Sequence, residues 1–279
     1  MDHTNKKYTG KPPTRRSLGQ NFLVHKHTVR TIIEVSGVKP GDRVVELGVG
    51  LGALTAELAG TAAGIIGIEI DERLLAWLAK EGRMPENVEL RQGDMLDISF
   101  GELSKELDEA LKIFGNLPYN ISSQMVFKLI DERDSIEWAV LMFQKEVAQR
   151  LMASPGSKDY GVLAVITGYA ARITKLLDVP ATLFRPKPKV ASTLVRFSFR
   201  PPVTAAEDFT VFKETVRTAF QQRRKKMSNS LKGFCGLPRD SLLEALTRCG
   251  IDPGDRPEVV SIENFVCLSN SILKSRKSS

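Results

Sequence analysis

Residues 43–59 decide the fold and read Arg43-Val-Val-Glu-Leu-Gly-Val-Gly-Leu-Gly-Ala-Leu-Thr-Ala-Glu-Leu-Ala59. The apolar run 43–47 predicts a buried strand, and residues 53–59 predict a helix. Between them, Gly48, Gly50 and Gly52 allow a tight turn and let a ligand approach backbone N–H groups. A strand, a glycine-rich turn and a helix in this order predict a ligand site at one edge of a parallel sheet.

The rest of the chain continues the alternation of strand and helix. We expect strands at 65–69, 88–91, 111–114 and 138–143, and helices at 26–36, 72–80, 123–130 and 146–152. This order predicts an α/β fold with a doubly wound, mostly parallel, Rossmann-like sheet. Apolar runs at 173–179 and 192–199 predict an antiparallel edge.

A break at Pro201-Pro202 separates this pattern from a purely helical one. Beyond it we expect helices at 209–231, 239–248 and 261–274. The predicted organisation is a basic arm over residues 1–20, an α/β domain over 21–200 and a small all-α domain over 201–279.

Composition excludes several classes of protein. The chain has 279 residues, of which 42% are hydrophobic and 26% charged, so it is neither disordered nor a coiled coil. No apolar run approaches the ~20 residues that span a bilayer. The start of the sequence lacks the apolar segment of a secretory signal. Three widely spaced cysteines, Cys235, Cys249 and Cys267, predict neither a disulfide framework nor a zinc site, and we expect a reducing, cytoplasmic setting without metal.

Two acidic residues follow predicted strands. Glu69 ends the second strand at about the 20-residue offset from the glycine turn where an acid binds ribose hydroxyls, which suits NAD and other adenosyl ligands equally. Asp94 follows the third strand, where a carboxylate can accept a hydrogen bond from an adenine amine. An acid in that position favours S-adenosylmethionine over NAD. The alternative for Asp94 is a helix cap or an Asx-turn.

The tetrad Asn116-Leu117-Pro118-Tyr119 follows the fourth strand. Asn116 offers a side-chain carbonyl, and the proline holds Leu117 extended, so that its backbone carbonyl points outward. Two acceptors beside an aromatic ring can bind the exocyclic amine of an adenine base and align it for attack on an electrophilic methyl group. The alternative is a rigid surface turn.

These segments, with others, resemble the ribosomal RNA small-subunit adenine dimethyltransferase family over about residues 15–275. The resemblance is carried by Gly19–Leu23, Glu46–Thr55, Gly115-Asn-Leu-Pro-Tyr-Asn-Ile-Ser122, Gln144–Val147, Phe184–Val190, Phe220–Lys225 and Asn229–Leu231. It implies a class I methyltransferase domain that transfers four methyl groups from S-adenosylmethionine to two adjacent adenosines in the 3′-terminal hairpin of 16S rRNA, during assembly of the small ribosomal subunit. One departure is Val49, where the family usually has proline, and we expect a looser loop.

The resemblance also implies roles for individual residues. Tyr119 would stack on the flipped base, and Phe184 would close its other face, beside the catalytic Asn116, Leu117 and Pro118. The cofactor contacts carried over are Asn21, Leu23, Gly48, Gly50, Glu69, Asp94, Met95 and Asn116.

The net charge of +7 suits a polyanionic partner. Two basic clusters are candidates for contact with RNA phosphates: Arg185, Lys187 and Lys189 in a proline-stiffened loop, and Arg223, Arg224 and Lys225 in a predicted helix. A charged linker and a solvated helix face are the respective alternatives.

Three other functions remain open at this point. They are a large-subunit rRNA adenine methyltransferase of the resistance type, an RNA-binding assembly factor with a vestigial site, and a nicotinamide dehydrogenase. We expect a monomer, because the partner is large.

Overall fold

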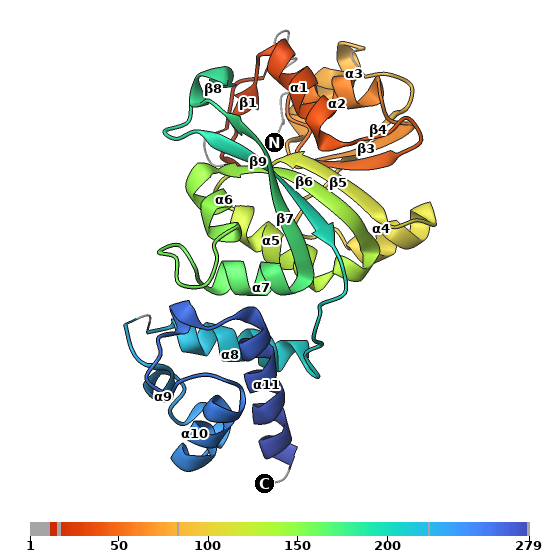
Figure 1. Ribbon diagram of the computed structural model, residues 1–279. Helices are drawn as coiled ribbons and strands as arrows, with labels where there is room; N and C mark the ends of the chain where they lie inside the picture. Colours follow the sequence, from red (N-terminus) through yellow and green to blue (C-terminus); the bar gives the residue numbers. More distant parts are fainter. Residues whose placement is uncertain (1–11, 16–17, 83, 223, 278–279) are drawn as a thin grey trace, which may run out of the picture. The chain divides into compact units, whose positions relative to one another are not determined.

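The structure is a computed structural model that describes residues 12–15, 18–82, 84–222 and 224–277. The chain forms two compact units (Figure 1). Unit 1 comprises the residues up to Ala148 together with Thr174–Ser198, and unit 2 comprises Gln149–Ile173 and the residues from Phe199 onward. The second part of unit 2 begins close to the boundary expected at residue 200. Residues 149–173, expected with the sheet, group instead with the C-terminal helices.

A seven-stranded sheet in the order β4-β3-β2-β5-β6-β9-β7 is the framework of unit 1. The strands are β2 (Arg43–Leu47), β3 (Gly64–Glu69), β4 (Val88–Gln92), β5 (Leu111–Asn116), β6 (Ile136–Gln144), β7 (Ala171–Val179) and β9 (Ser192–Phe199). Strands β4, β3, β2, β5 and β6 are parallel, and β9 is antiparallel to β6. The expected doubly wound, mostly parallel sheet with an antiparallel edge is confirmed.

The register brings the carboxyl ends of the central strands to one edge of the sheet. Leu47 on β2 lies opposite Ile68 on β3 and Gly115 on β5. The turns after these three strands, which carry the glycine loop, Glu69 and Asn116, are therefore neighbours. Ligands bind at this edge in open α/β sheets.

Helices cover both faces of the sheet, with α1 and α2 on one side and α4 and α5 on the other (Figure 1). The helices of this part of the chain are α1 (Lys26–Ser36), α2 (Ala53–Ala59), α3 (Glu72–Lys80), α4 (Phe100–Leu107), α5 (Ser122–Asp131) and α6 (Lys145–Leu151). Val29, Ile32 and Ile33 of α1 pack on the sheet in the same apolar cluster as Trp138 of β6. Helix α4 was not expected from the sequence.

A two-stranded antiparallel sheet pairs β1 (Phe22–Leu23) with β8 (Phe184–Arg185). Leu23 lies opposite Phe184 in this pairing. It attaches the segment before α1 to a loop more than 160 residues later, a contact that no local pattern in the sequence indicates.

Unit 2 is helical and has an aromatic core. Its helices are α7 (Val162–Ala170), α8 (Phe209–Phe220), α9 (Met227–Ser230), α10 (Arg239–Arg248) and α11 (Ile262–Lys277). Tyr169 of α7 stacks with Phe209 and Phe212 of α8, and Phe220 of α8 packs against Phe265 of α11. Helix α7 is apolar all round and buried, and its packing against α8 and α11 places it in this unit.

Two expectations for this region are wrong. The single helix expected at 209–231 is interrupted between α8 and α9, where the backbone of Lys226 is extended, with φ −68° and ψ 153°. The structure also joins Cys249 and Cys267 in a disulfide, where the sequence predicted none. Among the described helices, none is long and apolar enough to cross a membrane.

Candidate active site

The glycine loop between β2 and α2 requires glycine for its backbone shape. Gly48, Gly50 and Gly52 have φ values of +82°, +59° and +74°, which side chains other than glycine adopt only with strain. A Cβ atom on Gly50 would also lie 2.9 Å from the Phe22 ring. Val49 is buried against Trp77 of α3, so its side chain anchors the loop by packing.

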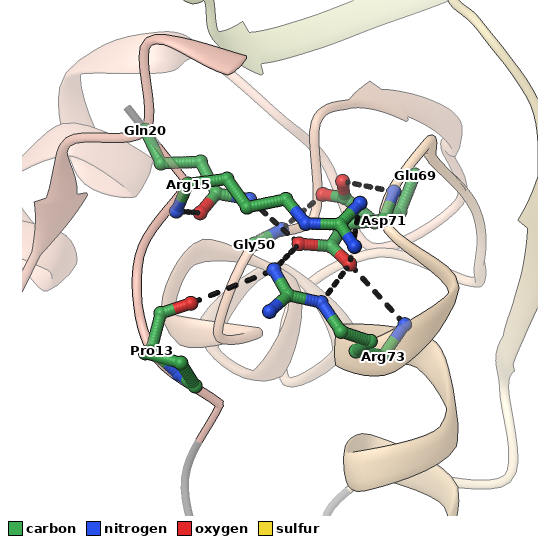
Figure 2. A network of polar contacts seen from close by, with 7 residues as sticks. All are labelled: Pro13, Arg15, Gln20, Gly50, Glu69, Asp71 and Arg73. Atoms are coloured by element: carbon green, nitrogen blue, oxygen red, sulfur yellow. Dashed lines mark hydrogen bonds and ion pairs between the residues drawn. The ribbon is translucent and has the colours of Figure 1, made fainter. Parts of the chain in front are cut away.

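Glu69, at the end of β3, binds the glycine loop directly. Its Oε2 accepts from the backbone N–H of Gly50 at 2.8 Å, and its Oε1 accepts from that of Asp71 at 2.9 Å (Figure 2). The residue is 5% exposed, and burial raises the pKa of its carboxyl, although the two backbone N–H groups oppose the shift. The carboxylate thus fixes the loop, and each oxygen retains capacity for a further hydrogen bond.

A pocket lies at this edge and brings together most of the predicted cofactor residues. Six of the eight line it: Asn21, Gly48, Gly50, Glu69, Met95 and Asn116. Ile70, Leu117 and Pro118 also contribute to its walls.

The other two predicted cofactor residues lie elsewhere. Leu23 is buried in the core cluster below the sheet edge. Asp94 is not part of the lining, and its Oδ1 accepts from the N–H of Leu96 at 2.9 Å, which is the Asx-turn alternative.

The segment Leu18–Phe22 forms a wall of the same pocket. Residues 18–20 were expected to belong to a basic arm and had no predicted role in the pocket. For Gly19 and Gln20, membership of the Gly19–Leu23 motif was the available signal.

Asn116 has its side-chain amide fixed by that wall. Its Nδ2 donates to the backbone carbonyl of Asn21 at 2.9 Å. Because the amide nitrogen is used in this way, the Oδ1 atom is left as an acceptor at the pocket. Leu117 and Pro118 continue the lining, as predicted for the tetrad.

Tyr119 is half-buried and held by its hydroxyl, which lies 2.8 Å from Ser192 Oγ on β9. Burial raises the pKa of Tyr119, with an opposing contribution from Ser192. The hydroxyl is therefore a fixed anchor for the ring. Tyr119 does not line the pocket in this conformation.

Phe184 is 0% exposed and packs in the core cluster with Leu23, Val179 and Leu194. The pairing of β8 with β1 holds its ring inward in this conformation. A completely buried ring can close a face of a bound base only if β8 moves, so the stacking role of Phe184 stays a prediction that requires such a movement.

The basic candidates lie on exposed turns. Arg185, Lys187 and Lys189 are exposed in the loop that begins with β8, in unit 1. Arg224 and Lys225 are exposed between α8 and α9 in unit 2, in a turn and not in the helix that was predicted. Arg223 lies outside the described residues. Within the part of the chain that the structure describes, no three His, Cys, Asp or Glu side chains gather as metal ligands.

The sequence matches a family of enzymes along most of its length. The family model for "Ribosomal RNA adenine dimethylase" matches residues 13–274. "Ribosomal RNA small subunit methyltransferase A" of Geobacter metallireducens is 41% identical, covering 93% of this chain and 95% of that protein, and the protein of the same name from Moorella thermoacetica is also 41% identical, covering 92% of each.

Two solved structures share the fold over most of the chain. A dimethyladenosine transferase from Plasmodium falciparum has a TM-score of 0.73 at 27% identity, covering 88% of this chain and 95% of its own. The 23S rRNA methyltransferase ErmE has a TM-score of 0.67 at 28% identity, covering 90% and 99%. The match along nearly the whole chain, together with the Asn116 tetrad beside the glycine loop, shows that the chain belongs to the ribosomal RNA adenine dimethylase family and is an rRNA adenine dimethyltransferase with a class I methyltransferase fold.

Proposed function

We propose that this enzyme uses S-adenosylmethionine to dimethylate the N6 amines of two adjacent adenosines in the 3′-terminal hairpin of 16S rRNA. The choice of the small subunit rests on relatives about 40% identical that carry small-subunit names, whereas the 23S rRNA enzyme is 28% identical. The observation that carries the chemistry is the fixed amide of Asn116, whose oxygen remains an acceptor in the pocket that the glycine loop and Glu69 also line.

The residues of the pocket fit an adenosyl cofactor. Glu69 retains lone pairs for ribose hydroxyls, and a Cβ on Gly48 would come within 3.3 Å of Met95, so the backbone there forms a narrow cradle. Ile70 is 42% exposed at the pocket, which suits contact with the flat face of a base. Asp94 does not line the pocket but precedes Met95, which does, and it would accept from the adenine amine with the oxygen that Leu96 does not use. When bound, the cofactor supplies an electrophilic methyl group on a sulfonium.

The tetrad residues would position the target amine. The Oδ1 of Asn116 and the backbone carbonyl of Leu117 would accept its two N–H bonds, and this orients the nitrogen lone pair toward the cofactor. Tyr119 would stack on the flipped base, with its ring direction set by the bond to Ser192. None of these steps needs a charged base on the protein.

The two basic clusters would bind the rRNA backbone. The first cluster begins at Arg185, the last residue of β8, and continues with Lys187 and Lys189. Arg224 and Lys225 lie in the helical unit. Phosphate contacts of this kind supply affinity without reading sequence. We propose that a monomer acts in the cytoplasm on an assembling small subunit.

The test is methyl transfer from labelled S-adenosylmethionine to small subunits that lack the modification, followed by mapping of the modified nucleotides. Two adjacent dimethylated adenosines near the 3′ end are expected. Asn116→Ala should abolish transfer and leave RNA affinity nearly unchanged, because phosphate contacts dominate binding. Modification of large-subunit RNA, or binding of small subunits without transfer by the unaltered protein, would contradict the proposal.

A further inference from the structure

The side chain of Gln20 connects the pocket wall formed by Leu18–Asn21 to two other segments of the chain. Its Oε1 accepts from the backbone N–H of Arg15 at 2.7 Å, and its Nε2 donates to Asp71 Oδ2 at 3.1 Å (Figure 2). Gln20 therefore connects the backbone of Arg15 to the pocket wall and attaches both to the start of α3.

The buried carboxylate of Asp71 is held in place to accept the hydrogen bond from Gln20. It is 1% exposed and caps α3, where it accepts from the backbone N–H and the guanidinium of Arg73. The hydrogen bond from the Arg73 side chain lowers the pKa of the Asp71 carboxyl, with a further contribution from Gln20. Arg15 approaches the same carboxylate at 4.0 Å, and Arg73 also lies 3.5 Å from the carbonyl of Pro13 (Figure 2).

The backbone of Asp71 connects this network to the pocket. Its N–H donates to Glu69 Oε1, and the other oxygen of Glu69 holds the glycine loop. On the far side of the wall, the carbonyl of Asn21 holds the amide of Asn116. The position of the wall therefore influences both the cofactor pocket and the acceptor for the target amine.

We propose that Asp71 is a positioning residue, which acts through Gln20 to hold Leu18–Asn21 as a wall of the cofactor pocket. The proposal rests on the proposed cofactor site and adds to it a residue that does not line the pocket. A helix cap alone would not require the side chain of Gln20, 51 residues earlier, to share the carboxylate.

The test compares two substitutions that are matched in their effect on helix capping. Asp71→Asn retains a capping oxygen, because Asn and Asp are about equally good N-caps, but its NH2 group cannot accept from Gln20. Asp208→Asn is the control, since Asp208 caps α8 in unit 2. Binding of S-adenosylmethionine is measured by calorimetry, and unfolding by thermal denaturation. Asp71→Asn removes the acceptor of both Gln20 Nε2 and Arg73 Nη2, and we expect the loss of the bond to Gln20 to weaken cofactor binding about tenfold. Asp208→Asn should leave cofactor binding unchanged.

A double-mutant cycle with Gln20→Met separates positioning from general destabilisation. Met fills similar space and makes neither hydrogen bond of Gln20. If Asp71 acts through Gln20, Asp71→Asn has little further effect on cofactor affinity once Gln20 is Met. Additive losses, or an Asp71→Asn protein that binds cofactor normally and differs only in thermal stability, would overturn the proposal. If the unaltered protein does not bind S-adenosylmethionine, it is the proposed function that fails.

Discussion

Replacing Gly50 by alanine isolates one contact at the floor of the cofactor pocket. Gly50 has a φ of +59°, and its missing Cβ would lie 2.9 Å from Phe22 Cε1 and 3.0 Å from Cδ1. Gly82 is the matched control, because it has a φ of +58° and nothing within 4 Å of its Cβ position. The two substitutions carry the same backbone strain and differ in the contact with the Phe22 ring.

The expected losses of stability follow from the backbone strain and from the contact with the Phe22 ring. Left-handed backbone costs alanine roughly 1–2 kcal/mol, and the stiffer unfolded chain returns about 0.4–1 kcal/mol, so Gly82→Ala should lose about 0–1.6 kcal/mol of stability. Gly50→Ala should lose a further ~1–3 kcal/mol, typical of overpacking, because Phe22 is buried in β1 and cannot swing away freely. The loop can relieve this strain only by moving, which weakens the bond from Gly50 N–H to Glu69.

Calorimetric titration with S-adenosylmethionine and thermal unfolding measure the two effects. If returning the displaced loop to its original position costs about 1–3 kcal/mol when the cofactor binds, the dissociation constant of Gly50→Ala rises about 5- to 150-fold. The dissociation constant of Gly82→Ala stays at the original value. Equal cofactor affinity in Gly50→Ala and the unaltered protein would refute the reasoning. Equal weakening in both variants would show that backbone strain, and not the Phe22 contact, is responsible.

Three further predictions concern other parts of the chain. Asp94→Ala should weaken cofactor binding by ~1–3 kcal/mol if the carboxylate pairs with a buried amine, and calorimetry checks this. Neutralising Arg223, Arg224 and Lys225 together should reduce the slope of log affinity against log salt for RNA binding by about 2–3; an unaltered slope would mean that the cluster is only solvated. Burial raises the pKa of the Glu46 carboxyl from 4.5 to about 8, with a smaller opposing effect from Thr55. The contribution of Glu46 to the free energy of unfolding is therefore fully present below pH 4.5 and is lost as the pH rises toward 8. Glu46→Gln should remove that loss, which unfolding midpoints between pH 4.5 and 8 measure.

Much of the α/β fold could be predicted because its elements have local causes. The strand at 43–47 and the helices at 53–59 and 72–80 have the predicted bounds in the structure. Each is a continuous apolar run or a stripe at helical spacing, with a glycine or aspartate at the boundary. The edge that carries Asn116 follows from the same reasoning, since parallel strands present their carboxyl ends together.

The elements that escaped prediction depend on distant parts of the chain or on short patterns. Helix α4 buries only Phe100 and Leu103 over its eight residues, too few to show a period. The β1–β8 pair consists of two residues on each side. This pairing buries Phe184, which could not be inferred from the sequence because the basic, proline-rich segment is typical of an exposed loop.

In the active site, too, the sequence predicts which residues take part but not how their side chains are oriented. Local pattern and resemblance identify Asn116, but the direction of its amide is set by the carbonyl of Asn21, 95 residues earlier in the chain. Asn21 is in turn adjacent to Gln20, which Asp71 holds. In the proposed site, the acceptor for the target amine depends on a chain segment before the first helix, so binding of the cofactor against that segment and alignment of the amine would be coupled through one wall. Substitutions in the Gly19–Leu23 motif should therefore alter cofactor affinity and turnover together, even where the side chain replaced touches neither substrate.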